Sequence, residues 1–338
     1  MNTSELDAAI EAAERADPLS AFVEAKPPEP EIKWPEGLPS PGIYKDISYD
    51  TYKSWPAINA SGLKILMDAS AKHCKAYMDG KLDKDTEDRR KGRAFHCALL
   101  EPNEYADRFP VSGTCCETLS SGKNKGKPCG NEGKFYEEST GSWYCGQHNK
   151  NHEEAIELPE TISQAASADI KCMRIEVFRH KVVSLLRQHG GCEVSLIWER
   201  EGIPCKARLD KLIIDSNCPD TIVDLKKIQV MAGSDEKLQN QINNNDYDLS
   251  ACWYVDGLRR LRPDKKKPLF AWIFAEDGYP YDVAPKWASK PTLEIGRMKA
   301  DNAFHAFRTC YLNDRWPGYS EDITEITPPD WQMKRYGL

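Results

Sequence analysis

The middle of the chain carries short apolar runs rich in β-branched residues, separated by turn-forming residues, and this pattern predicts consecutive strands. The strands expected from it are residues 193–198, 206–214, 221–225 and 269–275, with a short one near Tyr281. Because only short turns separate the first three runs, we expect these three strands to form an antiparallel meander.

On both sides of these runs, apolar residues recur at helical spacing. The helices expected are residues 60–79, 88–100, 162–188, 238–258 and 292–312. The hydroxyl of Ser61 is suited to cap the first of them. The order helix, three strands, helix, strand predicts an α/β fold.

The first residues and one internal stretch differ from this body in composition. Residues 4–16 predict a short helix rich in Ala and Glu, and the proline-rich segment after it favours an extended linker. We therefore expect residues 1–41 to form an N-terminal helix and linker, and residues 42–338 to form the folded domain. Within that domain, residues 113–150 lose the apolar pattern and are expected to be an insertion.

The chain has 338 residues, 40% of them apolar, and a formal net charge of −7. This balance argues against a protein that coats nucleic acid through a general positive field, so any DNA contact has to come from local basic stretches. Three stretches qualify: residues 89–93, which include Arg93; residues 123–127, which include Lys125; and residues 259–267. Each is equally compatible with an ordinary solvated surface.

The N-terminus contains acidic residues and lacks the apolar core of an export signal, and no window is apolar enough to span a membrane. We therefore expect a cytoplasmic protein of a bacterial or phage-infected cell, with no membrane partner. In a reducing compartment the 12 cysteines are not expected to form disulfides. Eight lie among apolar neighbours and are expected in the core: Cys74, Cys97, Cys172, Cys192, Cys205, Cys218, Cys252 and Cys310.

A candidate for phosphodiester chemistry lies in the segment TIVDLKK. Asp224 and Lys226 are two residues apart, so in a strand both side chains leave the same face. A carboxylate can hold Mg²⁺ against a phosphate while an ammonium orients the attacking water, and oxygen ligands suit Mg²⁺ or Mn²⁺ rather than zinc. Asp210, on the preceding strand, can meet them across a hairpin. The pattern alone is weak, because Asp and Lys also form surface pairs on many solvated strands.

Several segments, taken together and in order, resemble the nuclease domain of the RecE (exodeoxyribonuclease VIII) family, phage and prophage recombination exonucleases of the PD-(D/E)XK type. They are GIYKDISYDTY, INASGLKILMDASAKH, GRAFHCALLEPNEYADRF, CEVSLIWEREGIPCKARLDKLI, TIVDLKK and the tail LNDRWPGY with PPDW. The resemblance runs from about Gly42 to Trp331 and is interrupted near residues 111–160. It implies a restriction-endonuclease-like core, a central mixed β-sheet flanked by helices.

The resemblance also implies roles for individual residues. The residues implied to hold the divalent metal are His96, Asp210, Asp224 and, through its backbone carbonyl, Leu225. Lys226 is implied to be catalytic. Glu101 and Glu193 fall on family positions too, and we expect structural or supporting roles for them rather than a place among the metal ligands.

Two positions depart from the family pattern. Where the family has Gln four residues before a Tyr on the helix after the D-x-K strand, this chain has Ser250 before Tyr254. A serine cannot span the same distance to a phosphate or base, so we expect an altered DNA contact there. Lys227 stands where the family tends to have a small hydroxyl residue. Neither change affects the metal ligands, so activity is expected to survive.

The insertion offers sulfur and imidazole ligands for a second metal. The predicted set is Cys116, Cys129, Cys145 and His148, with Cys116 preferred to Cys115 by its spacing to Gly122. Three sulfurs and one imidazole form a tetrahedral Zn²⁺ set with no open position, so the zinc would be structural and would couple metal binding to local folding. The segment resembles small zinc modules of viral and phage proteins, and the alternative is a flexible loop with free thiols.

Three functions follow as hypotheses. The resemblance implies a Mg²⁺-dependent exonuclease that acts on double-stranded DNA ends in the 5′–3′ direction, leaves 3′ tails for a single-strand annealing recombinase and assembles as a homo-oligomeric ring. An endonuclease with the same fold is an alternative. The third is a non-catalytic DNA- or protein-binding module in which the zinc insertion is the working surface, and the intact set of one His, two Asp and one Lys argues against it.

Overall fold

The structure is a computed structural model that describes residues 33–82, 85–181, 190–215, 218–320, 322–323 and 325–337. The expected helix at residues 4–16 and the end of the helix expected at 162–188 lie outside these residues. Backbone contacts divide the chain into two units, Met1–Trp34 and Pro35–Leu338. All of the described helices and strands belong to the second unit.

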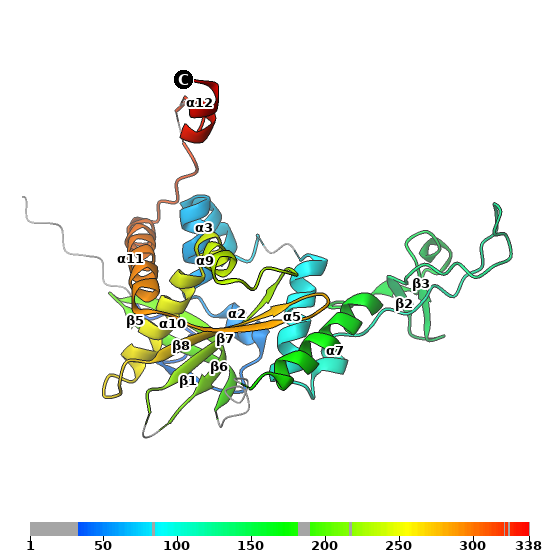
Figure 1. The fold of residues 1–338 in the computed structure, drawn as a ribbon, viewed down its shortest axis with the longest axis horizontal. Helices are drawn as coiled ribbons and strands as arrows, with labels where there is room; N and C mark the ends of the chain where they lie inside the picture. Colours follow the sequence, from blue (N-terminus) through cyan, green and yellow to red (C-terminus); the bar gives the residue numbers. More distant parts are fainter. Residues whose placement is uncertain are drawn as a thin grey trace, which may run out of the picture. The chain divides into compact units, whose positions relative to one another are not determined.

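A six-stranded mixed β-sheet forms the centre of this unit (Figure 1). In spatial order its strands are β1 (Gly42–Tyr44), β5 (Gly191–Arg200), β6 (Ile203–Ile213), β7 (Thr221–Ile228), β8 (Leu269–Glu276) and β9 (Val283–Trp287). β5, β6 and β7 are antiparallel neighbours, which confirms the predicted meander. β8 runs parallel to β7, and this direction requires the helical crossover between them.

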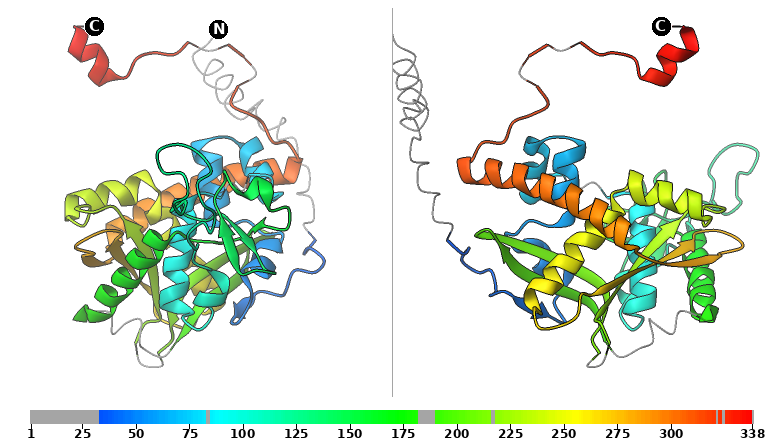
Figure 2. Two further views of the ribbon diagram at one scale, coloured as in Figure 1. Left: turned by 90° about the vertical axis from the view of Figure 1, so that its right-hand side faces the viewer. Right: turned by 60° about the vertical axis from the view of Figure 1, so that its left-hand side comes forward.

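Helices cover both faces of the sheet (Figure 2). The helices that precede β5 are α2 (Tyr49–Ser54), α3 (Ala60–Asp68), α4 (Ala71–Met78), α5 (Glu87–Leu100), α6 (Tyr105–Arg108) and α7 (Gln164–Arg179). Those that follow β7 are α9 (Asp235–Asn244), α10 (Tyr247–Leu261), α11 (Lys290–Asn313) and α12 (Asp330–Tyr336). None of the described helices is both long and apolar enough to cross a membrane.

Alternate residues of β7 face different helices. Val223 and Leu225 are fully buried in a core cluster with residues of α5 and α7. Because side chains alternate along a strand, Asp224 and Lys226 point to the other face, where the Lys226 ammonium lies against Tyr247 of α10. The apolar residues of β7 therefore anchor the strand in the core, and its polar residues Asp224 and Lys226 lie on the face where the divalent metal was predicted to bind.

Two of the predicted long helices are interrupted. The helix expected at 60–79 is α3 followed by α4, because the Ser70 hydroxyl accepts the backbone N–H of His73 and starts a new helix. Asn59, not Ser61, caps α3 through its side-chain oxygen. The helix expected at 238–258 is α9 followed by α10, and between them Asp246 adopts a left-handed φ of 48°.

The start of α10 is fixed by α11. The helices cross so closely at Gly296 that a Cβ there would lie 2.1 Å from the carbonyl oxygen of Asp248. Nearby, the Lys299 ammonium pairs with Asp246 at 2.7 Å and with Asp248 at 3.1 Å. These contacts set the position of Tyr247 beside the sheet.

The insertion leaves and rejoins the core at a narrow neck. The backbone N–H of Ser112 donates to Ile162, and the N–H of Ile162 donates to Pro110. The inserted segment therefore continues to about residue 161, beyond the end expected for the insertion at residue 150. Its secondary structure is a small sheet in the order β3-β2-β4 and one turn of 3-10 helix: β2 (Phe135–Glu137), β3 (Ser142–Tyr144), η2 (Asn149–Asn151) and β4 (Ile156–Glu157).

The cysteines expected in the core fall into three groups. Cys74, Cys97, Cys205 and Cys252 are buried as predicted. Cys172, Cys192 and Cys310 are half-buried. The prediction is wrong for Cys218, which is exposed because it lies on the turn between β6 and β7.

Candidate active site

The candidate active site lies where β6 and β7 stop pairing. The last ladder pair is Lys211 with Val223, so the next opposed residues are Asp210 and Asp224. Beyond that pair a side chain replaces the backbone as hydrogen-bond acceptor: Asp210 Oδ2 accepts the backbone N–H of Leu225 at 2.6 Å. The two acidic residues predicted to meet across the hairpin thus face each other where the sheet opens.

A second carboxylate and an imidazole converge on Asp210. The ligand atoms of His96, Glu193 and Asp210 all lie within 4.8 Å of one another, and His96 Nδ1 is 3.5 Å from Asp210 Oδ1. His96 comes from α5, so three separate elements supply the group. This arrangement brings together residues that are far apart in the sequence.

Glu193 occupies an unusual position on β5. The flanking pairs, Cys192 with Lys211 and Val194 with Leu209, place it directly opposite Asp210. Its φ of 49° is left-handed, a conformation that costs a side-chain-bearing residue about 1–3 kcal/mol. We expected Glu193 outside the metal ligands, and the structure instead places its carboxylate among the possible ligands.

Lys226 and Asp224 form a tight ion pair beside this group. Lys226 Nζ is 2.5 Å from Asp224 Oδ2 and 3.3 Å from the carbonyl oxygen of Leu225. Burial opposes the charge on Lys226, but the carboxylates of Asp224 and Asp210 raise its pKa above the ordinary value. The ammonium therefore persists at neutral pH. Burial, together with the negative charge of Asp210, raises the pKa of Asp224.

The donors of this site suit a hard divalent cation. Burial disfavours charge on His96 and Asp210, yet each stabilises the other, so the pKa of His96 is raised and that of Asp210 is lowered. Neighbouring ligands of an octahedral Mg²⁺ with bonds of about 2.1 Å lie about 3 Å apart. The His96 to Asp210 separation of 3.5 Å is close to that value. A metal would draw its ligands from His96, Glu193 and Asp210, with Asp224 and the Leu225 carbonyl adjacent.

A second ammonium near the site was missed in the sequence. Lys64 of α3 donates to the carbonyl oxygen of Asn245 at 2.8 Å. Its Nζ lies 5.4 Å from the centroid of the Tyr247 ring, and Lys226 Nζ lies 5.2 Å from the same centroid. Burial and then the charge of Lys226 lower the pKa of Lys64 to about 8. Two like charges beside one ring make this side of the site attractive to anions.

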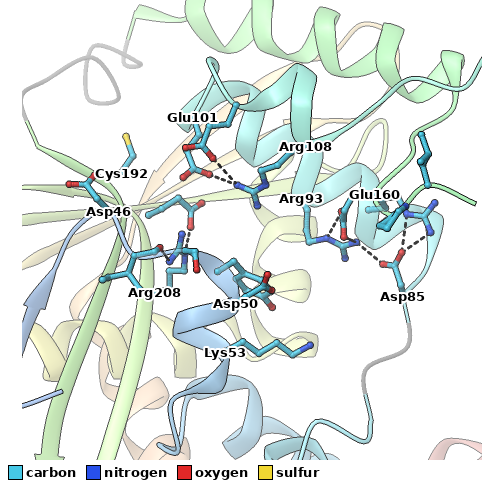
Figure 3. Close-up of a pocket in the computed structure, with 18 of the residues that line it drawn as sticks. Asp46, Asp50, Lys53, Asp85, Arg93, Glu101, Arg108, Glu160, Cys192 and Arg208 are labelled. Atoms are coloured by element: carbon cyan, nitrogen blue, oxygen red, sulfur yellow. Dashed lines mark hydrogen bonds and ion pairs between the residues drawn. The ribbon is translucent and has the colours of Figure 1, made fainter. Parts of the chain in front are cut away.

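The residues predicted to bind DNA are found in three places. Ser250 and Tyr254 lie one turn apart on α10, and Tyr254 is close enough to Asp224 for that charge to add to the effect of burial in raising its pKa. Arg93 is engaged on two sides, by Asp85 and Glu160 (Figure 3). Lys125 is exposed in a turn of the insertion. Their roles remain predictions.

A hollow of about 970 Å³ has Glu193 in its lining. Figure 3 shows this hollow, with Cys192 and Arg208 on one side and Arg93 and Glu160 on the other. Its lining contains five basic and eight acidic side chains, a balance of −3. The arginines that line it are held by carboxylates: Arg108 is 2.8 Å from Glu101, and Arg208 is 2.6 Å from Glu193. This hollow therefore orients acidic groups beside the site and presents no surplus of positive charge to a phosphate.

The predicted sulfur and imidazole ligands also come together, with one correction. The cluster consists of Cys115, Cys129, Cys145 and His148, whose ligand atoms lie within 4.8 Å of one another. Cys116, the predicted ligand, is exposed, and its thiol donates to the carbonyl of Thr114. The physical reason is that the segment is extended and Cys115 bridges to Trp143, so the next side chain points to the opposite side.

The dimensions of this cluster fit zinc. Tetrahedral Zn–S bonds of about 2.3 Å separate two sulfurs by about 3.8 Å. Here Cys129 Sγ and Cys145 Sγ are 3.9 Å apart, and His148 Nδ1 is 3.3 Å from Cys115 Sγ and 3.5 Å from Cys145 Sγ. Burial would raise the pKa of Cys145, but backbone N–H groups of Gln147 and His148 lower it to about 7. The thiolate that a metal needs is thereby favoured.

Comparison with known proteins agrees with this geometry. Residues 59–327 match the model of a family described as a PDDEXK-like domain of unknown function (DUF3799). Among solved structures, one from Eubacterium rectale, whose protein is named provisionally as an exonuclease, superposes with a TM-score of 0.53 at 12% identity, over 86% of this chain and 98% of its own. That likeness shows the fold.

A second solved structure, of SSO0001, covers 42% of this chain and 60% of its own at 14% identity, and its TM-score of 0.25 carries no argument. No curated protein matches. The predicted PD-(D/E)XK fold is confirmed, while the finer resemblance to RecE remains a prediction. The chain has a central mixed sheet that carries this site, and the family model matches most of the chain's length. The chain therefore belongs to the family of PDDEXK-like domains of unknown function.

Proposed function

We propose that the protein is a Mg²⁺-dependent exonuclease that acts on double-stranded DNA. The observation that carries this proposal is the convergence of His96, Glu193 and Asp210 beside the Asp224–Lys226 pair. A fold of the PDDEXK type supports a nuclease that needs a divalent metal. The preference for DNA ends, the 5′–3′ direction, the annealing recombinase and the ring-shaped homo-oligomer rest on the resemblance to RecE.

The roles in the reaction follow from positions around the carboxylates. A bound Mg²⁺ would polarise the scissile phosphate and lower the pKa of a bound water. His96, Glu193 and Asp210 would hold it, and Asp224 would complete its ligands from the opposite strand. Lys226, kept protonated by two carboxylates, would orient the attacking water or stabilise charge on the phosphate.

Lys64 and Tyr247 complete the side of the site that faces α3 and α10. The ammonium of Lys64 would contact the DNA backbone next to the scissile phosphate, and Tyr247 would keep it apart from Lys226. In the insertion, Cys115, Cys129 and Cys145 together with His148 would hold a structural Zn²⁺. Because those four donors complete a tetrahedron, that metal would stabilise the insertion rather than take part in hydrolysis.

The test compares strand-specific, end-labelled linear duplex with covalently closed circular DNA, in Mg²⁺ and then in chelator. We expect nucleotides from the linear substrate, an intact circle, and no reaction with chelator. Asp224→Asn should lower kcat/KM by about a thousandfold, since a metal site supplies several kcal/mol to the transition state. The control is Asp107→Asn, which makes the same substitution at an exposed position on α6 and should keep wild-type kcat/KM.

Three results would contradict the proposal. Cleavage of the closed circle would identify an endonuclease with the same fold. Wild-type protein that releases no nucleotides under any divalent metal, or Asp224→Asn that cuts as well as wild type, would remove the catalytic assignment. Binding of DNA without turnover would then support the non-catalytic module.

A further inference from the structure

A second hollow, of about 530 Å³, lies between α10, α11 and the end of β5. Its charged lining consists of Arg200, Arg259, Arg260, Arg297, Asp256 and Asp301, and we call it the arginine pocket. Its balance of +2 is opposite in sign to that of the hollow beside Glu193. The arginine pocket is thus basic in a chain whose net charge is −7.

Two of the four arginines are already matched by carboxylates. Arg297 is 3.1 Å from Asp256, and Arg200 is 2.7 Å from Asp301. Within the described part of the chain, Arg259 and Arg260 form no side-chain ion pair or hydrogen bond, and both are exposed. The Nε of Arg200 is turned away from the pocket opening, since it pairs with Glu201 at 3.8 Å and its guanidinium lies over the Phe304 ring. The pocket therefore has guanidinium donors left over for an anion.

The basic character continues from the pocket into the next loop. Pro263 lines the pocket, and Lys265, Lys266 and Lys267 follow it as exposed residues between α10 and β8, which we call the lysine loop. Guanidinium groups bind phosphate oxygens in pairs, and a row of lysines adds sequence-independent attraction to a phosphate polymer. The ligand chemistry that fits the pocket and the loop together is a nucleic-acid backbone rather than a single small anion.

We propose that the arginine pocket and the lysine loop bind the phosphate backbone of the DNA that the active site cuts. This inference rests on the proposed function. Tyr247, at the start of α10, lies beside Lys226, and Arg259 lies twelve residues further along the same helix. At about 1.5 Å per residue the separation along α10 is about 18 Å. That distance corresponds to about five or six base pairs at about 3.4 Å each.

The geometry therefore sets a length threshold. A duplex of about four base pairs, about 14 Å long, engaged at the active site ends before it reaches the pocket, whereas a duplex of about 30 base pairs covers both. We expect the pocket to strengthen binding only for the longer DNA. During repeated cleavage it would retain the substrate between steps.

The test measures equilibrium binding of both duplexes in chelator, over a series of salt concentrations, so that no cleavage occurs. Removing two phosphate contacts with Arg259→Ala/Arg260→Ala should weaken binding of the long duplex about tenfold and reduce the salt slope by about 2. Binding of the short duplex should not change. Arg259→Lys/Arg260→Lys should keep most of the slope, which separates a charge effect from misfolding.

The matched control is Lys171→Ala/Arg174→Ala, which removes the same charge from exposed positions on α7. If the pocket double variant binds the long duplex with wild-type affinity and salt slope, the inference is wrong, whatever the catalytic result. A different result is that the wild type cuts no DNA, but Arg259→Ala/Arg260→Ala binds the long duplex more weakly than the wild type does. In that case the proposed exonuclease fails and the backbone-binding pocket stands.

Discussion

The candidate active site and the cluster of Cys115, Cys129, Cys145 and His148 both gather potential metal ligands from distant segments, but they are supported differently. The active-site carboxylates sit on strands of eight to eleven residues. Their apolar neighbours Val223 and Leu225 are fully buried. The cysteine cluster is held by strands of only two or three residues.

This difference separates the two roles of a metal. Long paired strands and a buried core fix the carboxylates of the candidate active site without an ion, so a metal bound there would serve the proposed chemistry. The insertion has few buried apolar residues, and two of its four cysteines, Cys115 and Cys145, are among them. A metal bound there would be coupled to local folding. Loss of the ion should therefore cost activity at one site and structure at the other.

The largest expected effect is in the insertion. Cys115→Ser should abolish zinc binding, because structural zinc contributes about 10–16 kcal/mol in small zinc-dependent domains. Hydrogen exchange should then become fast in residues 113–161, while the melting temperature of the core changes by less than about 2 °C. Zinc quantification and hydrogen exchange measure this.

Cys116→Ser is the matched control at the neighbouring position and should retain one zinc per chain. Loss of zinc from Cys116→Ser but not from Cys115→Ser would show that the structure assigns the wrong cysteine. Loss of core stability in Cys115→Ser would remove the distinction between the two regions.

The choice between these two cysteines shows what sequence spacing cannot decide. Spacing restricts the ligand to one of two adjacent residues, but their side chains point in opposite directions in an extended chain. The direction is set by the bridge between Cys115 and Trp143, which are far apart in sequence. The general ligand set was therefore predictable and the individual residue was not.

Glu193 shows the opposite case, because its position was available in the sequence. The turn at Glu201-Gly202 separates two predicted strands, and pairing outward from it places Glu193 opposite Asp210. The left-handed backbone at Glu193 has no sequence signal, since glycine is the usual residue there. Lys64 could not be found because its contacts depend on the break between α9 and α10, where one continuous helix was expected.

A smaller effect is expected at Glu193 itself. Glu193→Gln keeps an acceptor for Arg208 but removes a negative ligand, so affinity for Mg²⁺ should fall at least about tenfold. Saturating Mg²⁺ should restore part of the rate. Titration of cleavage with Mg²⁺ measures this, with the exposed Glu199→Gln on the same strand as control. An unchanged Mg²⁺ dependence would exclude Glu193 from the ligands.

The smallest expected effect comes from replacing a lysine by methionine, which can be done both beside the candidate active site, at Lys64, and in the insertion, at Lys125. Lys64→Met should raise KM for DNA about three- to tenfold with little change in kcat, since it removes one backbone contact. The wild-type ammonium of Lys64 is present below its pKa of about 8 and is lost as pH rises through that value. KM of the wild type should therefore increase above about pH 8, and Lys64→Arg should remove this increase because a guanidinium stays charged.

The groups that face Lys64 are Lys226 and Asp224 of β7, with Asp246 and Asp248 at the start of α10. Lys226 has a raised pKa, so it stays charged through the same range and does not explain the increase. Lys125→Met, at an exposed turn of the insertion, gives the comparison and should leave the pH profile of KM unchanged. If Lys64→Met has the wild-type KM and pH profile, Lys64 serves only to hold the end of α9 through the carbonyl of Asn245, and the substitution should then lower thermal stability alone.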